Sequence, residues 1–174
     1  MLVICLWRKA IISPIPKDDK NDKRVPLNYR GISLICCTAK LYGSLLNNRI
    51  SNFLNLDNKL VYEQNVIRND RSCLDHIFVL YSIVRNRQKE NLPTFTAFVD
   101  LKKAFDCVNR EFLMYKVIED GIDGKVYVSL KSMYNITEAC VKIGTNMQTS
   151  WFTTLFGVGD SLSPTLFSIY LNDL

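Results

Sequence analysis

An apolar stretch that ends in a carboxylate is the part of this sequence best suited to chemistry. Residues 94–100 have the period-two pattern of a strand, and the strand ends at Asp100. A carboxylate held rigidly at the end of a strand suits a divalent metal ion. Phe105, in the turn that follows, would place a flat apolar wall beside that ion, where it could press on a sugar ring and reject a 2′-hydroxyl. We therefore expect metal and nucleotide chemistry here.

These residues also have ordinary structural explanations. An Asp at the end of a strand often caps the next turn, and Phe105 could simply pack in the core. Asp106 need not point the same way as Asp100. A phosphohydrolase with Asp100 as its nucleophile is disfavoured, because Lys102 stands where a second Asp would be needed.

The charge is divided unevenly along the 174 residues, a length typical of one domain. Residues 1–90 carry 15 Lys and Arg against 8 Asp and Glu, whereas residues 91–174 carry 7 against 9. The net charges of +7 and −2 suggest a polyanion partner for the first half and metal ions for the second. Solvated surface charge is the simpler alternative.

Composition argues against membrane and secreted proteins. No run of 18 apolar residues occurs, so we expect no spanning helix and no membrane partner. The opening apolar residues 2–7 are too short for a secretory signal, which leaves a nuclear or cytoplasmic protein as the expectation.

The cysteines do not resemble a disulfide framework or a zinc site. Cys36, Cys37, Cys107 and Cys140 lie in apolar segments, where a thiol behaves as a small hydrophobe. The sequence has one histidine, and the cysteines lack the spacing of zinc ligands. We expect reduced, buried thiols.

Hydrophobic periodicity predicts one α+β domain. Helices are predicted over residues 38–56, 72–90, 110–120 and 125–134, and from Ser163 onward, with Ser72 and Ser163 as caps and Pro164 in the first turn. Strands are predicted over residues 9–15, 94–100, 139–144 and 151–156, of which the last two form a hairpin. A charged loop is predicted over residues 17–28.

Five stretches resemble motifs of one family in the family's order. Residues 98–108 resemble the first catalytic motif of reverse transcriptases from non-LTR retrotransposons. The others are residues 7–17, which look like the strand that opens the fingers; 28–34 (Asn-Tyr-Arg-Gly-Ile-Ser-Leu, with Gly31 where Pro is common); 63–72; and 157–174, with its Gly-Asp-Ser-Leu-Ser-Pro. The resemblance therefore covers nearly the whole chain.

The resemblance implies a right-hand polymerase fold with fingers (residues 1–92) and a partial palm (residues 93–174). We expect residues 94–100 and 139–144 to share one antiparallel palm sheet, with the helices of residues 110–134 packed on one face. The implied reaction is RNA-templated DNA synthesis from a DNA primer and dNTPs, with two Mg²⁺ ions and no small-molecule cofactor.

The same resemblance implies a role for individual residues. Asp100 and the backbone carbonyl of Leu101 would bind metal, and Phe105 would be the steric gate against ribonucleotides. Lys17 and Arg30 would pair with triphosphate oxygens. The residues expected along the template path are Gln64, Arg68 and Arg71.

Three departures from the family pattern bear on activity. The Tyr/Phe-x-Asp-Asp motif that should follow the last helix is missing, and Asp173 has no adjacent Asp to replace it. Gly157-Val158 runs directly into Gly159 without the expected Arg-Gln pair, and Val66-Ile67 replaces Gly-Phe. We therefore expect this chain to be inactive alone. A residual nucleic-acid-binding module without catalysis remains the alternative.

Overall fold

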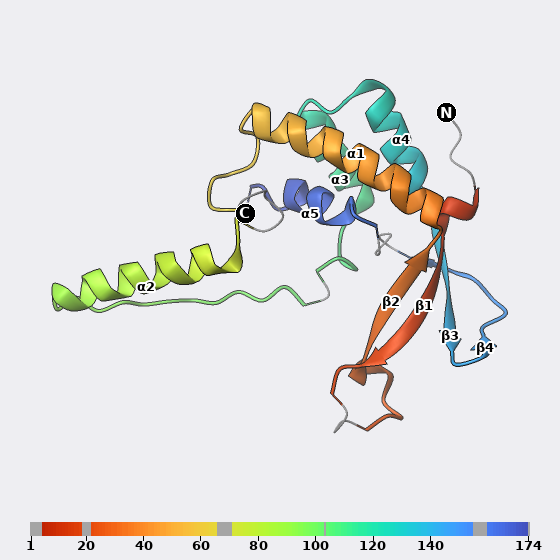
Figure 1. Cartoon of the computed structure of the whole chain (residues 1–174), viewed down its shortest axis with the longest axis horizontal. Coiled ribbons are helices and arrows are strands. Elements are labelled where there is room, and N and C mark those ends of the chain that lie inside the picture. The colour runs from red at the N-terminus through yellow and green to blue at the C-terminus, as the bar shows by residue number, and fades with distance from the viewer. Residues whose placement is uncertain (1–4, 19–21, 66–70, 103, 155–159, 174) are drawn as a thin grey trace.

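The computed structural model describes residues 5–18, 22–65, 71–102, 104–154 and 160–173, which form five α-helices and one mixed sheet of five strands (Figure 1). The α-helices are α1 (Cys37–Leu56), α2 (Cys73–Lys89), α3 (Arg110–Glu119), α4 (Gly124–Tyr134) and α5 (Ser163–Tyr170). The strands are β1 (Lys9–Pro16), β2 (Tyr29–Ile35), β3 (Thr137–Ile143), β4 (Asn146–Met147) and β5 (Phe152–Thr154). Two 3₁₀ helices, η1 (Cys5–Arg8) and η2 (Pro26–Asn28), precede β1 and β2. The predicted α+β class is confirmed.

The sheet joins the first and last parts of the chain. Its order is β2-β1-β3-β4, with β5 also paired to β3. β1 and β2 form an antiparallel hairpin, and β1 runs parallel to β3 with Ala10 opposite Ala139 and Ile12 opposite Val141. The antiparallel pairing of β3 with β5 confirms the predicted hairpin over its described part. In Figure 1 the β1–β2 hairpin projects away from the helices, so one of its faces is open to form a wall.

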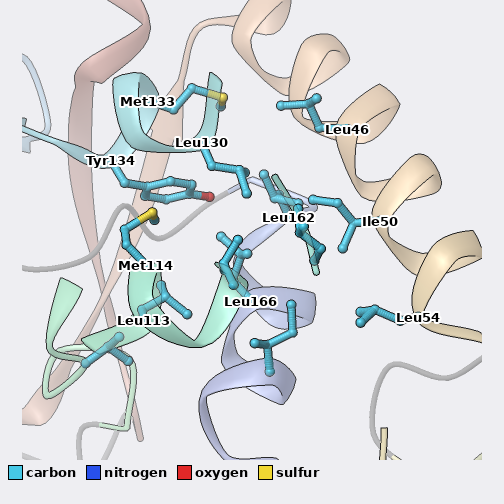
Figure 2. Packing of buried hydrophobic residues seen from close by; sticks show 14 residues of the cluster. Leu46, Ile50, Leu54, Leu113, Met114, Leu130, Met133, Tyr134, Leu162 and Leu166 are labelled. Carbon is cyan, nitrogen blue, oxygen red and sulfur yellow. The ribbon is translucent and has the colours of Figure 1, made fainter. Parts of the chain in front are cut away.

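The core lies where α5 packs against α1, α3 and α4. Figure 2 shows apolar side chains from these helices converging, with Leu46, Ile50 and Leu54 of α1 on one side. Leu162, Leu166 and Ile169, at the start of and along α5, have 0% exposed surface. α5 is therefore the helix around which the others are organised.

Local signals explain where the helices begin and end. Asp75 accepts a hydrogen bond from the Ser72 backbone N–H (2.6 Å), so the predicted cap of α2 is confirmed. α3 ends before Gly121, whose φ of +85° is a left-handed conformation that glycine adopts freely. Pro164 lies in the first turn of α5 as predicted, but the cap position belongs to Leu162 and not to Ser163.

The predicted strand over residues 94–100 is wrong. These residues are exposed and have no strand partner in the described part of the chain, so they do not share a sheet with β3. A period-two pattern produces a strand only where a neighbour supplies backbone hydrogen bonds, and the neighbours of β3 are β1, β4 and β5. In Figure 1 the segment instead runs alongside α2. The expectation that residues 94–100 and 139–144 share one antiparallel palm sheet is therefore wrong.

The expectation of buried cysteines is also largely wrong. Cys36, Cys37, Cys73 and Cys107 are exposed free thiols, whereas Cys140 in β3 is buried. Leu34 and Leu41, near these two cysteines, are 50% and 73% exposed, so an apolar local sequence does not by itself bury a thiol.

None of the helices in the described residues is both long and apolar enough to cross a membrane.

The central position of α5 predicts a large effect of truncating its buried side chain. Leu166→Ala should lower the free energy of unfolding by about 2–5 kcal/mol, because it removes packed atoms and leaves a cavity. Urea denaturation followed by circular dichroism measures this loss. The matched control is Leu74→Ala on α2, where the side chain is 72% exposed, and it should change stability by less than about 0.5 kcal/mol. Equal losses in the two variants would contradict the assignment of the core.

Candidate functional site

A cleft of about 1440 Å³ lies between the β1–β2 hairpin and the chain segment that leads into α3. Its lining comes from segments that are far apart in sequence, including Lys17 and Arg30 from the hairpin and residues 100–102 and 104–106 from the segment before α3. Asp160, Tyr134 and the start of β3 complete it. Most of the residues that the sequence singled out for chemistry therefore share one cavity.

The hairpin wall carries the cations. The Lys17 backbone N–H donates to the Asn28 carbonyl, and its ammonium donates to the Leu27 carbonyl (both 2.8 Å). Arg30 follows on β2 and is exposed. Lysine has three ammonium hydrogens, so this anchoring leaves further donors directed at the cleft or the solvent.

Gly31 keeps the same wall open. It lies opposite Pro14 in the hairpin, and a Cβ added there would approach Cγ2 of Ile12 to 2.8 Å. Ile12 also lines the cleft, so any side chain at position 31 would displace it. The glycine that stands where the family often has Pro is thus explained by its contact with Ile12.

The opposite wall combines carboxylates with an aromatic ring. Asp100, Leu101 and Asp106 are exposed, whereas Phe105 is half-buried. The Phe105 ring packs against Phe167 of α5 with 4.7 Å between centroids, and it lies against the edge of the core. The carboxylates are therefore open to ligand, while the aromatic wall is supported from behind.

Asp160 closes the rear of the cleft and is fully engaged. Its Oδ1 accepts hydrogen bonds from the backbone N–H groups of Leu162 (3.1 Å) and Ser163 (2.7 Å) and from the Ser163 hydroxyl (2.7 Å). Its Oδ2 accepts from the Tyr134 hydroxyl at 2.7 Å. Asp160 thus caps α5 and joins it to α4. Its carboxylate has a structural role, whereas those of Asp100 and Asp106 are exposed in the cleft.

The ring hydroxyl of Tyr134 stays protonated over a wide pH range. Burial raises the pKa of Tyr134 well above its usual value, and the charge of Asp160 and the hydrogen bond to it act in the same direction. The group is therefore a permanent donor to Asp160 at neutral pH.

A comparison with known protein families shows to which family this chain belongs. The pattern of the family described as reverse transcriptase (RNA-dependent DNA polymerase) matches residues 15–174. The chain belongs to the reverse transcriptase family. The match includes β2, the segment before α3, and α5, whereas most of β1 precedes it.

Two transposon proteins are similar to this reverse transcriptase chain. One is the "Transposon TX1 uncharacterized 149 kDa protein" of Xenopus laevis, 26% identical over 137 residues, or 78% of this chain and 10% of that protein. The other is the "Probable RNA-directed DNA polymerase from transposon BS" of Drosophila melanogaster, 27% identical over 170 residues, or 97% of this chain and 18% of that protein. The chain thus spans less than a fifth of the length of either relative.

Two of the residues predicted along the template path lie outside the lining of the cleft. Gln64 donates from Nε2 to the Ser168 carbonyl of α5 (3.1 Å), and the Arg71 guanidinium stacks over Tyr62 at 4.4 Å from the ring centroid. Arg68 is outside the described residues, as are the sequence departures at residues 66–67 and 157–159.

The described residues do not complete the magnesium centre that reverse transcriptases generally use. In the described ranges no three His, Cys, Asp or Glu side chains are grouped closely enough to hold a metal ion. Asp160 is committed to its hydrogen bonds and Glu138 is paired with Lys9 at 3.7 Å, so Asp100 and Asp106 are the described cleft carboxylates that remain exposed. This donor set is too small for two ions, and we derive no catalytic step through them.

Sequence reasoning gave no role to Tyr134 and Asp160. Asp160 could have been found, because an Asp a few residues before Ser163-Pro164 is a helix-start signal. Tyr134 gave no signal, since its partner lies 26 residues away.

The buried Tyr134 predicts a specific loss of stability in alkali. Above pH 10, the usual pKa of tyrosine, the unfolded chain loses the proton that the folded protein retains. The free energy of unfolding should then fall by up to about 1.4 kcal/mol per pH unit from this group. Urea denaturation between pH 9 and about 11 should show a shallower decline in Tyr134→Phe than in the wild type. Tyr127→Phe on the same helix is the control and should retain the wild-type decline; an unchanged decline in Tyr134→Phe would contradict the assignment.

Proposed function

We propose that this chain is the fingers (residues 1–92) and part of the palm (residues 93–174) of a retrotransposon reverse transcriptase of the non-LTR type, and that its cleft binds a dNTP beside the template RNA and the primer. One observation carries the proposal. Asp100, Leu101 and Phe105 line the same cleft as Lys17 and Arg30, although about 70 residues of chain separate the two groups.

Phosphate binding is assigned to the hairpin wall. The Lys17 ammonium and the Arg30 guanidinium line it, and the guanidinium fork can bind two phosphate oxygens at once. The Lys17 anchor to Leu27 fixes the position of one charge before a ligand arrives, which lowers the entropy lost on binding. A triphosphate would thus lie along β2 and the end of β1.

Sugar selection is assigned to Phe105. A deoxyribose can pack on a ring that Phe167 supports from behind, whereas a 2′-hydroxyl would have to be buried against that ring without a hydrogen-bond partner. Asp100 and the Leu101 carbonyl would be ligands for one magnesium ion, which would neutralise phosphate charge when bound.

The chain alone should not extend a primer. Its sequence contains no Tyr/Phe-x-Asp-Asp, and one carboxylate motif does not hold two ions. Purified protein assayed on poly(A)/oligo(dT) with Mg²⁺ or Mn²⁺ should show no extension above background. Robust extension that Asp100→Ala abolishes would contradict this prediction, and extension that Asp100→Ala leaves intact would reveal a contaminating polymerase.

Binding of nucleic acid without catalysis is the second candidate, and the net charge of +7 on residues 1–90 favours it. In this proposal Gln64 and Arg71, which lie outside the cleft lining, contact the template together with Arg68. Gln64 would contact nucleic acid only if its hydrogen bond to Ser168 is exchanged, so we expect the arginines to contribute more.

The contribution of the cleft to nucleic-acid binding is measured by its salt dependence. For single-stranded RNA, each phosphate contact contributes about 0.7 to the slope of log affinity against log salt. Lys17→Ala/Arg30→Ala should therefore flatten the slope by about 1.4, measured by fluorescence anisotropy.

The control is Lys40→Ala/Lys125→Ala, which removes the same charge from exposed sites outside the cleft and should leave the slope almost unchanged. Equal slopes in the two double variants would show that the cleft does not lie on the nucleic-acid path. Arg68→Ala/Arg71→Ala tests the remaining pair in the same assay.

A further inference from the structure

We infer that Tyr134 is a positioning residue that sets the sugar selectivity of the cleft, acting through Asp160 and α5 on the aromatic wall formed by Phe105. This inference rests on the proposed nucleotide cleft and deepens it. It concerns a residue that lines the cleft, and the role assigned to it here is one of positioning through its hydrogen bond to Asp160.

The first step is the bond between α4 and α5. The Tyr134 hydroxyl, at the end of α4, donates to Oδ2 of Asp160 at 2.7 Å in a buried setting. The other oxygen of the same carboxylate accepts both backbone N–H groups that open α5, those of Leu162 and Ser163. The carboxylate therefore transmits the position of α4 directly to the first turn of α5.

The second step runs from α5 to the cleft. Phe167, one turn along α5, supports the Phe105 ring with 4.7 Å between centroids, and Phe105 lines the cleft. α5 is short, and Leu166 and Ile169 are packed without exposed surface while Phe167 is half-buried, so we expect it to move as one rigid body. A shift of its first turn must therefore displace Phe167 and the ring that it supports.

The third step concerns what remains when the Tyr134 hydroxyl is removed. α5 and its leading segment are also held to α1, through the Thr165 hydroxyl on Asn47 Oδ1 (2.6 Å) and the hydroxyl pair of Ser44 and Ser161 (2.9 Å). Loss of the α4 bond leaves these links to α1 in place. The helix should stay folded and change position, which makes the effect one of geometry.

The structure supplies a matched control for this bond. Tyr42 of α1 donates to the Ser129 hydroxyl of α4 at 3.0 Å, also in a partly buried setting, and neither residue lines the cleft. Tyr42→Phe and Tyr134→Phe each remove one hydroxyl and an interhelical hydrogen bond, and Tyr134→Phe also removes the interaction of that hydroxyl with Ser163 of α5. A merely structural role predicts the same result for both variants.

The experiment is a titration of the whole chain with dUTP and with UTP, which differ only in the 2′-hydroxyl, in Mg²⁺, followed by intrinsic tryptophan fluorescence, since Trp7 lines the cleft. The wild type should prefer dUTP. Tyr134→Phe should reduce the dUTP-over-UTP preference between about twofold and tenfold, the range for loss of one hydrogen bond. Tyr42→Phe should keep the wild-type preference, even where its melting temperature falls as far.

A double variant tests the route through the aromatic wall. If Tyr134 acts on selectivity through Phe105, then in the Phe105→Ala background Tyr134→Phe should produce no further change in the dUTP-over-UTP ratio. An additive change in that background, an unchanged ratio in Tyr134→Phe alone, or the same change in Tyr42→Phe would each overturn the inference. A wild type that binds neither nucleotide would instead overturn the proposed cleft function and the inference with it.

Discussion

The burial of α5 is the constraint on which the rest of this structure depends. α5 and its leading residue place Leu162, Leu166 and Ile169 against α1, α3 and α4, and none of these side chains retains exposed surface. Its partners in α1 precede it by more than 100 residues, so the helix closes the chain on itself. Without that contact the buried face of α1 would lose the apolar packing of α5, and Phe105 would lose the support of Phe167.

Polar groups fix where α5 sits within this apolar setting. Apolar packing alone tolerates small shifts, because leucine and isoleucine surfaces pack in several ways. A buried carboxylate tolerates less, since each of its oxygens must keep a donor. Asp160 satisfies both oxygens with groups on α4 and α5, and Thr165 and Ser161 bond to α1. Apolar burial stabilises α5, and this network specifies its position.

The elements that the sequence predicted well are those with local causes. The helices of residues 38–56, 110–120 and 125–134 begin and end within a residue of α1, α3 and α4, because periodicity and stop signals lie within each segment. The strand prediction for residues 94–100 was wrong for the opposite reason. The alternation of apolar and polar residues is present, but a strand also needs a neighbouring strand to pair with. Similarly, Cys36 and Cys37 are exposed because burial depends on which face of α1 packs, which composition does not reveal.

For the site, too, some residue positions follow from local sequence motifs and others from contacts between residues far apart in the chain. The cleft unites Lys17 and Arg30 with Asp100 and Phe105, as expected from the motifs, whereas Gln64 is bonded to α5. The fold sets the basic first half, which supplies the hairpin wall, against the acidic second half, which supplies Asp100 and Asp106. A ligand that satisfies both walls must carry negative charge toward the hairpin and bring cations to the carboxylates. The nucleoside triphosphate that we propose as ligand would offer its negative charge to the hairpin wall, and the pairing of β1 with β3 sets that wall beside the start of β3, which also lines the cleft.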